Sequence, residues 1–177
     1  MNNGDMLQAF EDVFGDLLPM VPSAPQFSIY CAGPISGQGY DEVVGYYKKI
    51  VGKLSKMGFD VLYPMCGKSY LRNEIEFKAE GYEHPLSTNH AILRRDRWMI
   101  EKADVIYVNL VRGAERVSIG TVAEMGMAHA LGGKHVVTVL PDDNIHNHSF
   151  VLEMSDVVFK TEDEAEEYLG KLAGGTV

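Results

Sequence analysis

The residues with the clearest chemical potential are two acidic side chains on predicted helices, Glu124 and Asp96. Glu124 lies four residues after Gly120 and four before Ala128, on the small and apolar face that should pack inward. Asp96 lies in the middle of the apolar stripe of the preceding helix. A buried carboxylate is costly unless it binds something or takes part in chemistry, and two carboxylates in different environments can act as nucleophile and proton donor. A salt bridge between Asp96 and a neighbouring arginine is the structural alternative.

Groups suited to an anion surround the start of the helix that carries Glu124. This helix follows an apolar run and a short polar loop, with Ser118 as N-cap and Gly132 as the C-terminal stop. The N-terminus of a helix offers free N–H groups and a favourable dipole to a negative ligand. Arginines cluster on either side of the preceding strand, where they either bind a small anion or lie solvated on the surface: Arg94, Arg95, Arg97, Arg112 and Arg116.

A glycine-rich loop, residues 31–39, directly follows the first predicted strand. Gly33 and Gly37 allow tight turning and close approach of the backbone to a phosphate or a sugar. Their spacing differs from that of the dinucleotide-binding fingerprint. The later run Gly67-Lys68-Ser69 is not a P-loop either, because Leu62 occupies the position of the first glycine.

Short β-rich runs alternate with helical patterns along the chain. This alternation predicts an α/β fold of right-handed βαβ units, in which helices cover both faces of a mostly parallel, five-stranded sheet. Ligands in such folds bind beyond the carboxyl ends of the strands. The predicted strands are Phe27–Ala32, Phe59–Tyr63, Asp104–Val111, His135–Leu140 and Asp156–Phe159, and the predicted helices are Tyr40–Met57, Thr88–Lys102, Ile119–Leu131 and Glu162–Leu172.

Length and composition predict one α/β domain, residues 27–177, preceded by a short segment that is either an appendage or an oligomer contact. Within residues 1–26, an amphipathic helix over Met1–Leu18 is followed by a linker that contains three prolines. The net charge of −9 argues against binding to nucleic-acid polymers or anionic membranes. Two cysteines make no disulfide framework, and no signal peptide or membrane span is recognisable, so a cytoplasmic protein is expected.

Two loops leave their roles open. The segment 64–87 is long for a connection and rich in large side chains, so it is either a lid or binding loop or a satellite hydrophobic cluster. The loop after the fourth predicted strand carries His146 and His148. Two histidines with no nearby Asp or Cys ligand pattern make a weak metal site, so neither a metal nor another cofactor is expected.

Three motifs in the same order resemble the nucleoside 2-deoxyribosyltransferase family. They are Tyr30-Cys31-Ala32-Gly33-Pro34-Ile35-Ser36-Gly37, then Arg95-Asp96 followed by Ala103-Asp104-Val105, and Ser118-x-Gly120-Thr121-x-x-Glu124-x-Gly126-x-Ala128. The resemblance runs from Phe27 to the C-terminus and leaves residues 1–26 outside. It implies a flavodoxin/Rossmann-like three-layer fold and cleavage of the N-glycosidic bond of a nucleoside or nucleotide.

The resemblance also implies roles for individual residues. Glu124 matches the nucleophile that attacks C1′ of the sugar, and Asp96 matches the acid that protonates the departing base. Tyr30 matches a tyrosine beside the nucleophile. Members of the family commonly form homodimers or higher oligomers in which a neighbouring subunit completes the site, and Ser149 matches that donated position.

One departure from the family pattern bears on the substrate. Transferases of free nucleosides carry an acid six residues before the nucleophile and an asparagine at the donated position, where this chain has Ser118 and Ser149. With Ser36, these serines resemble the nucleoside 5′-monophosphate N-glycosidase branch. An acid at position 118 would repel a phosphate, whereas a serine there donates to it. The predicted substrate-binding residues are Gly33, Ser36, Gly37, Arg112, Arg116, Ser118, Gly120 and Ser149.

Several functions remain open from the sequence. Hydrolysis and transfer to a second base would use the same carboxylates. A catalytically silent nucleotide-binding module is a further possibility. An NAD-processing or redox protein is a third possibility, but the chain lacks the dinucleotide-binding fingerprint that such a protein would carry.

Overall fold

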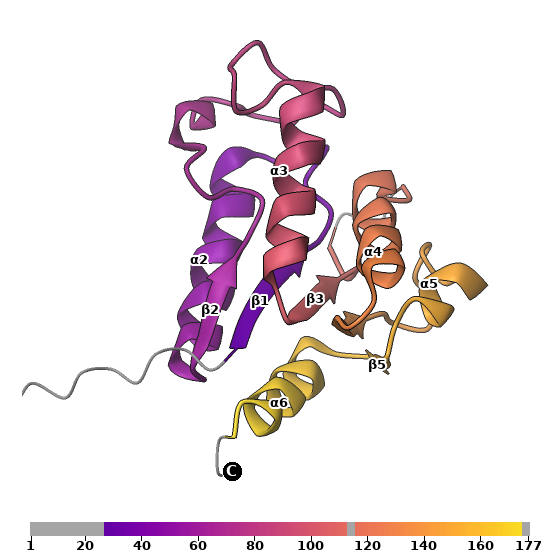
Figure 1. Ribbon diagram of the computed structural model, residues 1–177. Coiled ribbons are helices and arrows are strands. Elements are labelled where there is room, and N and C mark those ends of the chain that lie inside the picture. The colour runs from indigo at the N-terminus through magenta and orange to yellow at the C-terminus, as the bar shows by residue number, and fades with distance from the viewer. Residues whose placement is uncertain (1–26, 113–115, 175–177) are drawn as a thin grey trace, which may run out of the picture.

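Strands and helices alternate along the part of the chain that the computed structural model describes, residues 27–112 and 116–174 (Figure 1). The strands are β1 (Phe27–Ala32), β2 (Phe59–Leu62), β3 (Val105–Asn109), β4 (His135–Val139) and β5 (Val157–Phe159). The helices are α2 (Tyr40–Lys56), α3 (Asn89–Lys102), α4 (Ile119–Leu131), α5 (Ser149–Glu153) and α6 (Glu162–Leu172), with a short 3₁₀ turn, η1 (Ser69–Leu71).

The five strands form one parallel sheet in the order β2-β1-β3-β4-β5. This order is typical of the flavodoxin-like fold, so the predicted α/β class and the five-stranded sheet are confirmed. The chain passes from β1 to β2 on one side and reaches β3 on the other side of β1. Connections therefore diverge between β1 and β3, and ligands of this fold bind in the crevice at that point.

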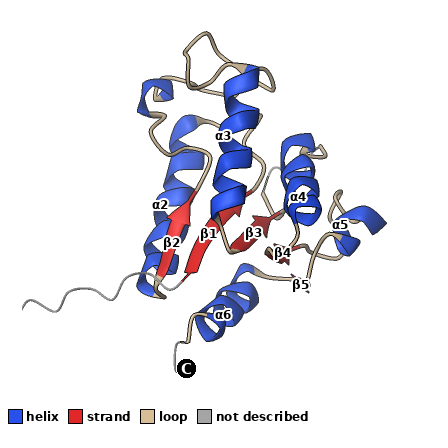
Figure 2. Cartoon of the chain, in the orientation of Figure 1, coloured by secondary structure: helices blue, strands red, loops and turns tan. Residues whose placement is uncertain are grey.

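Helices cover both faces of the sheet, as predicted (Figure 2). One core cluster joins the sheet to α2 and α6, and the other joins it to α3, α4 and α5. Successive side chains of a strand point to opposite faces, so Ile29 and Cys31 lie in the first cluster while Tyr30 and Ala32 lie in the second. The alternation along β1 thus points Tyr30 toward the layer that contains α3 and α4.

The predicted boundaries agree with the structure to within two residues, because local capping groups mark them. Thr88 accepts a hydrogen bond of 3.2 Å from the amide of Ala91, and Thr161 forms a capping box with Glu164. Sequence patterns missed α5 and η1, which are too short to show a period. The predicted N-terminal helix and linker lie outside the described residues.

The cysteines and the helix lengths bear on the predictions made from composition. Cys31 and Cys66 are both free thiols. Among the described residues, none of the helices combines the length and the apolar character that crossing a bilayer requires.

Candidate active site

A cavity of about 470 Å³ lies beyond the carboxyl ends of β1, β2 and β3, where the strand order predicts a ligand. Its volume falls in the range of pockets that enclose small organic ligands. The lining comes from four parts of the chain: Gly33–Ser36 after β1; Pro64, Met65, Lys68, Leu71, Phe77–Glu80, Tyr82 and Ser87 between β2 and α3; Ile92 and Asp96 of α3; and residues 116–121 with Glu124 around the start of α4.

The long segment 64–87 lines the cavity, and its buried apolar residues belong to the main core and not to the satellite cluster that was the alternative prediction. Leu71 and Phe77 are buried in the core cluster on the α2 side of the sheet, and both also line the cavity. The exposed stretch that follows, Lys78–Glu80, forms part of the rim. The segment is therefore a cavity-lining loop whose own apolar side chains fix it to the core.

Glu124 is almost fully buried, and its only hydrogen bond within the described structure comes from Tyr30. The Tyr30 hydroxyl donates to Oε1 of Glu124 at 2.5 Å. Burial, and then the charge of Asp96, raise the pKa of Glu124 to about 8, while the bond from Tyr30 opposes the rise. Burial and the two carboxylates raise the pKa of Tyr30 well above its ordinary value, so the phenol stays a neutral donor.

Asp96 is also more than nine-tenths buried, and its Oδ1 makes no hydrogen bond within the described residues. Burial raises its pKa to about 6, against the opposing charges of Lys68 and Arg95. The alternative of a salt bridge is not found among the described ion pairs. Arg95 instead donates to the backbone carbonyls of Pro64 and Cys66, and so holds the loop after β2. A buried carboxyl oxygen without a partner, facing a cavity, is suited to a ligand.

Lys68 is a site residue that sequence reasoning missed. Its side chain is buried, lines the cavity and forms no ion pair within the described structure. Burial lowers its pKa, and the charges of Asp96 and Glu124 oppose that shift. The signal was present, because a lysine directly after a glycine turn follows a strand at the ligand edge of the sheet. The run Gly67-Lys68-Ser69 contains Lys68, but sequence reasoning compared this run only with the P-loop motif.

The start of α4 forms the polar end of the cavity. The Ser118 hydroxyl lies 2.9 Å from that of Thr121 and caps the Thr121 amide at 3.5 Å. The N–H groups of Ile119 and Gly120 come first in the helix and have no acceptor within it. Arg116 lines the same end, and its guanidinium lies over Gly37 in the loop after β1. Donors of this kind at a helix N-terminus suit a phosphate.

The sequence of the chain matches a known enzyme family. The sequence profile of nucleoside 2-deoxyribosyltransferase matches residues 29–166. The chain belongs to this family. No curated protein sequence matches the chain.

Solved structures of two 2-deoxyribosyltransferases share the fold at low identity. A 2-deoxyribosyltransferase from Bacillus psychrosaccharolyticus is 22% identical, with 80% of this chain and 91% of that chain covered and a TM-score of 0.56. A 2-deoxyribosyltransferase from Leishmania mexicana is 21% identical, with 82% and 97% covered and a TM-score of 0.52. The CMP N-glycosidase BcmB from Clostridium botulinum is more remote, at 16% identity, 82% and 96% covered and a TM-score of 0.49.

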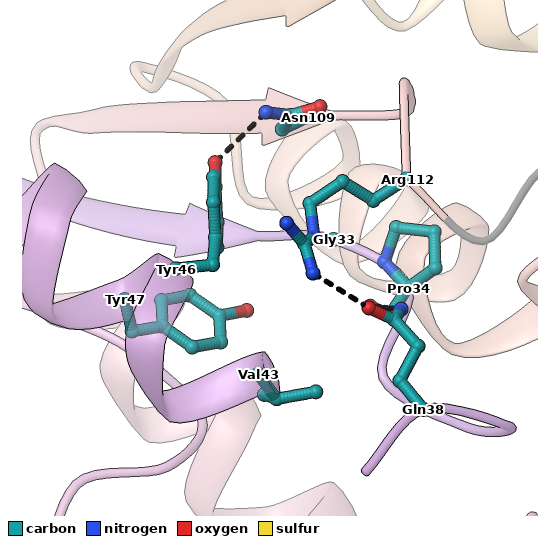
Figure 3. Close-up of a pocket in the computed structure, with 8 residues that line it drawn as sticks. All are labelled: Gly33, Pro34, Gln38, Val43, Tyr46, Tyr47, Asn109 and Arg112. Atoms are coloured by element: carbon teal, nitrogen blue, oxygen red, sulfur yellow. Dashed lines mark hydrogen bonds between the residues drawn. The ribbon is translucent and has the colours of Figure 1, made fainter. Parts of the chain in front are cut away.

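Three of the predicted substrate-binding residues do not line the cavity of this nucleoside 2-deoxyribosyltransferase family member. Arg112 faces a separate pocket of about 10 Å³ (Figure 3), where it donates to Gln38 at 3.0 Å and packs against the ring of Tyr46. Gly37 supplies the turn after β1, with φ of 85°. Ser149 is exposed at the start of α5.

The remaining predicted residues are brought together. Glu124 and Asp96 line the buried end of the cavity and Gly33, Ser36, Arg116, Ser118 and Gly120 also line it, while Tyr30 reaches it through Glu124. Gly33 is needed for close packing, since a Cβ there would lie 3.0 Å from the carbonyl oxygen of Asn109. Of the two histidines after β4, His146 is buried and bonded to the Ser118 amide, and the described residues contain no group of three potential metal ligands.

Proposed function

We propose that the protein cleaves the N-glycosidic bond of a (2′-deoxy)nucleoside 5′-monophosphate and releases the free base and the sugar 5-phosphate. The observation that carries this proposal is the pair of buried carboxyls, Glu124 and Asp96, on one cavity with Tyr30 bonded to the first. Two carboxyls on one cavity are what glycoside cleavage through a covalent intermediate requires. Membership of the nucleoside 2-deoxyribosyltransferase family supports a nucleoside or nucleotide as the substrate.

In the first step, the bond between C1′ and the base nitrogen breaks, and its electron pair leaves with the base. Asp96 transfers its proton to the base, which departs neutral. A carboxylate oxygen of Glu124 stabilises the oxocarbenium-like transition state and forms a bond to C1′. The products of this step are the free base and a glycosyl ester of Glu124.

In the second step, water replaces the carboxylate at C1′. The Asp96 carboxylate accepts a proton from the water, whose oxygen bonds to C1′ as the ester bond breaks. Glu124 leaves as a carboxylate, Asp96 is protonated again, and the sugar 5-phosphate is free. The two carboxyls thus return to their starting protonation state.

The electrostatics of the site suit a mechanism that needs one proton on the pair. Both pKa values are raised, so between about pH 6 and about pH 8 the two carboxyls hold a single proton. The higher pKa of Glu124 places that proton mainly on Glu124, whereas catalysis requires it on Asp96 when the base leaves. The hydrogen bond from Tyr30 favours the ionised form of Glu124, and so favours this arrangement.

The polar end of the cavity supports a 5′-phosphate. Ser118, the first N–H groups of α4 and Arg116 all lie at that end, and no acid lies in the first turn of α4. A phosphate there would accept hydrogen bonds from the serine and the helix amides. Ser149, matched by the resemblance to a residue donated by a neighbouring subunit, is exposed on α5 and free of this cavity, as that role requires.

Transfer of the deoxyribosyl group to a second base is the second candidate, and the family match favours it. A second base in place of water would attack C1′ in the same covalent intermediate. The two reactions therefore differ in the acceptor and not in the first step.

The test is a panel of nucleosides and 5′-monophosphates incubated with the enzyme, with and without a second free base, and separated by liquid chromatography. We expect free base from 5′-monophosphates without an added acceptor, and a sugar-phosphate adduct on the protein by mass spectrometry after acid quenching. Glu124→Gln should lose both signals. A new nucleoside that appears only with a second base would favour transfer, and no release of base from any compound would contradict both candidates.

A further inference from the structure

His146 is buried in the loop between β4 and α5, with 1% of its surface exposed, and it does not line the cavity. Its Nε2 lies 2.8 Å from the amide nitrogen of Ser118, which can only donate. Its Nδ1 lies 2.8 Å from Oδ1 of Asn144, an amide oxygen that can only accept. These two partners require a neutral imidazole with its proton on Nδ1 and a lone pair on Nε2.

Asn144 fixes this histidine to the end of β3. Its Nδ2 donates to the carbonyl of Leu110 at 2.7 Å, which orients the amide so that Oδ1 faces His146. The same oxygen accepts a second bond, at 2.9 Å, from the backbone amide of His146. A continuous series of hydrogen bonds therefore runs from Leu110 through Asn144 and His146 to Ser118.

The Ser118 amide is the point where α4 begins. His146 takes up this N–H group, whereas the next amides, those of Ile119 and Gly120, have no acceptor within the helix, and both residues line the cavity. The bond also sets the place of the helix start relative to β3, and with it the place of Glu124, six residues further along the chain.

We propose that neutral His146 is a positioning residue for the phosphate end of the site, which it sets through the Ser118 amide. This inference rests on the proposed function, because it takes the start of α4 as the place of the 5′-phosphate. His146 itself touches neither substrate nor the reacting atoms.

The role depends on protonation. An imidazolium has two N–H donors, so a protonated His146 would turn a donor toward the Ser118 amide and the bond would break. Burial lowers the pKa of His146, which keeps it neutral near pH 7. The ionisable residues on its own loop are Asp142, Asp143 and His148, and Arg116 lies two residues before its partner Ser118. Burial is the only cause of the pKa shift.

The test compares His146→Leu, which loses both ring nitrogens, with His146→Gln, whose amide oxygen can accept from Ser118. We expect His146→Leu to raise KM for 5′-monophosphates about tenfold, as the loss of one hydrogen bond allows, with a much smaller change in kcat. KM for nucleosides should change far less, because they lack the phosphate. His146→Gln should restore most of the affinity. The matched control is His148→Gln, on the exposed histidine of the same loop, which should resemble the wild type.

Two readouts separate positioning from a merely structural role. In the wild type, KM for a 5′-monophosphate should rise as pH falls below the pKa of His146. In His146→Gln the rise should be smaller, because the substrate phosphate titrates in the same way but no histidine is protonated at this position. Long-range proton–nitrogen NMR should show the Nδ1–H tautomer at neutral pH. Thermal unfolding of each variant verifies that it is folded.

The outcomes distinguish the two proposals. If the wild type favours 5′-monophosphates and His146→Leu keeps the same KM, or if His146→Gln is no better than His146→Leu, the role of His146 is wrong. If the wild type itself does not favour 5′-monophosphates, the phosphate assignment fails, and the role given to His146 fails with it.

Discussion

The hydroxyl of Tyr30 donates a 2.5 Å hydrogen bond to Glu124, a residue 94 positions later in the chain. They meet because β1 lies beside β3, and α4 follows β3 back over the face of the sheet toward which Tyr30 points. The phenol stabilises the charged form of a carboxylate that burial and Asp96 make hard to ionise. Tyr30 therefore increases the fraction of Glu124 that is ionised near neutral pH.

Removal of this hydroxyl gives the first prediction. In Tyr30→Phe the pKa of Glu124 should rise further, so that less of it is ionised at pH 7. We expect kcat at pH 7 to fall about 10- to 100-fold, and the acidic limb of the pH–rate profile to move to higher pH. Rates of base release from pH 5 to 10 measure both effects. An acidic limb that stays in place would show that Tyr30 does not tune Glu124.

The pH profile of the wild type is the second prediction. Below about pH 6 the pair gains a second proton and the nucleophile is lost, and above about pH 8 it loses its last proton and no acid remains. We therefore expect kcat/KM to follow a bell between these limits. Asp96→Asn should reduce the rate about 10²- to 10⁴-fold with natural bases and far less with a 4-nitrophenyl leaving group, which departs without a proton. Equal losses with both leaving groups would remove Asp96 from the role of acid.

Much of this site could be predicted from the sequence because its signals are local. The apolar stripes on either side of Asp96 and Glu124 predicted two inward carboxyls, and the N-cap at Ser118 predicted the start of α4. Burial depends on tertiary packing, so the sequence could not show that Lys68 would be enclosed. Arg112 was predicted at the anion end because of its place in the chain, but it lies 3.0 Å from both Gln38 and Glu42. His146 was considered as a metal ligand, since nothing local reveals that its ring nitrogen accepts from an amide donor 28 residues earlier.

The third prediction concerns stability. The pKa of Glu124 is raised from 4.5 to about 8, so the folded protein binds this proton more tightly than the unfolded chain. Such a group stabilises the fold fully below about pH 4.5, and this contribution is lost as pH rises through about 8. Glu124→Gln cannot ionise. Its Tm should exceed that of the wild type at pH 9, by about 2–4 °C for each kcal/mol gained, and the difference should shrink toward pH 5.

Calorimetry of both proteins across this pH range measures the third prediction. Asp96 is present in both proteins, so the difference between them reports Glu124 together with its interaction with Asp96. A wild type that is as stable as the variant at pH 9 would mean that Glu124 carries no burial penalty.

The fourth prediction assigns an electrostatic role to Lys68. Its charge lowers the pKa values of both Asp96 and Glu124. Lys68→Met keeps the apolar stem without the charge, so both limbs of the pH–rate profile should move to higher pH, by about one unit. Lys68→Arg keeps the charge and should leave the limbs near their wild-type positions. If the limbs of the pH–rate profile do not move in Lys68→Met, the Lys68 ammonium lies too far from Asp96 and Glu124 to shift their pKa values.

The fifth prediction tests the phosphate end through Ser118, six residues before the nucleophile. Ser118→Asp retains an N-cap side chain, so α4 should still begin at the same residue. Its carboxylate would meet the 5′-phosphate as a like charge in a partly enclosed site. We expect kcat/KM for 5′-monophosphates to fall about a hundredfold or more, because such a contact costs several kcal/mol, while that for nucleosides does not fall. Ser118→Ala removes the hydroxyl without adding charge, and should lower kcat/KM for 5′-monophosphates only about tenfold.

The decisive quantity is the ratio of kcat/KM for 5′-monophosphates to kcat/KM for nucleosides in each variant. Because the carboxyls that break the bond are the same for both classes, a ratio that Ser118→Asp leaves unchanged would place the phosphate elsewhere while leaving the roles of Glu124 and Asp96 intact.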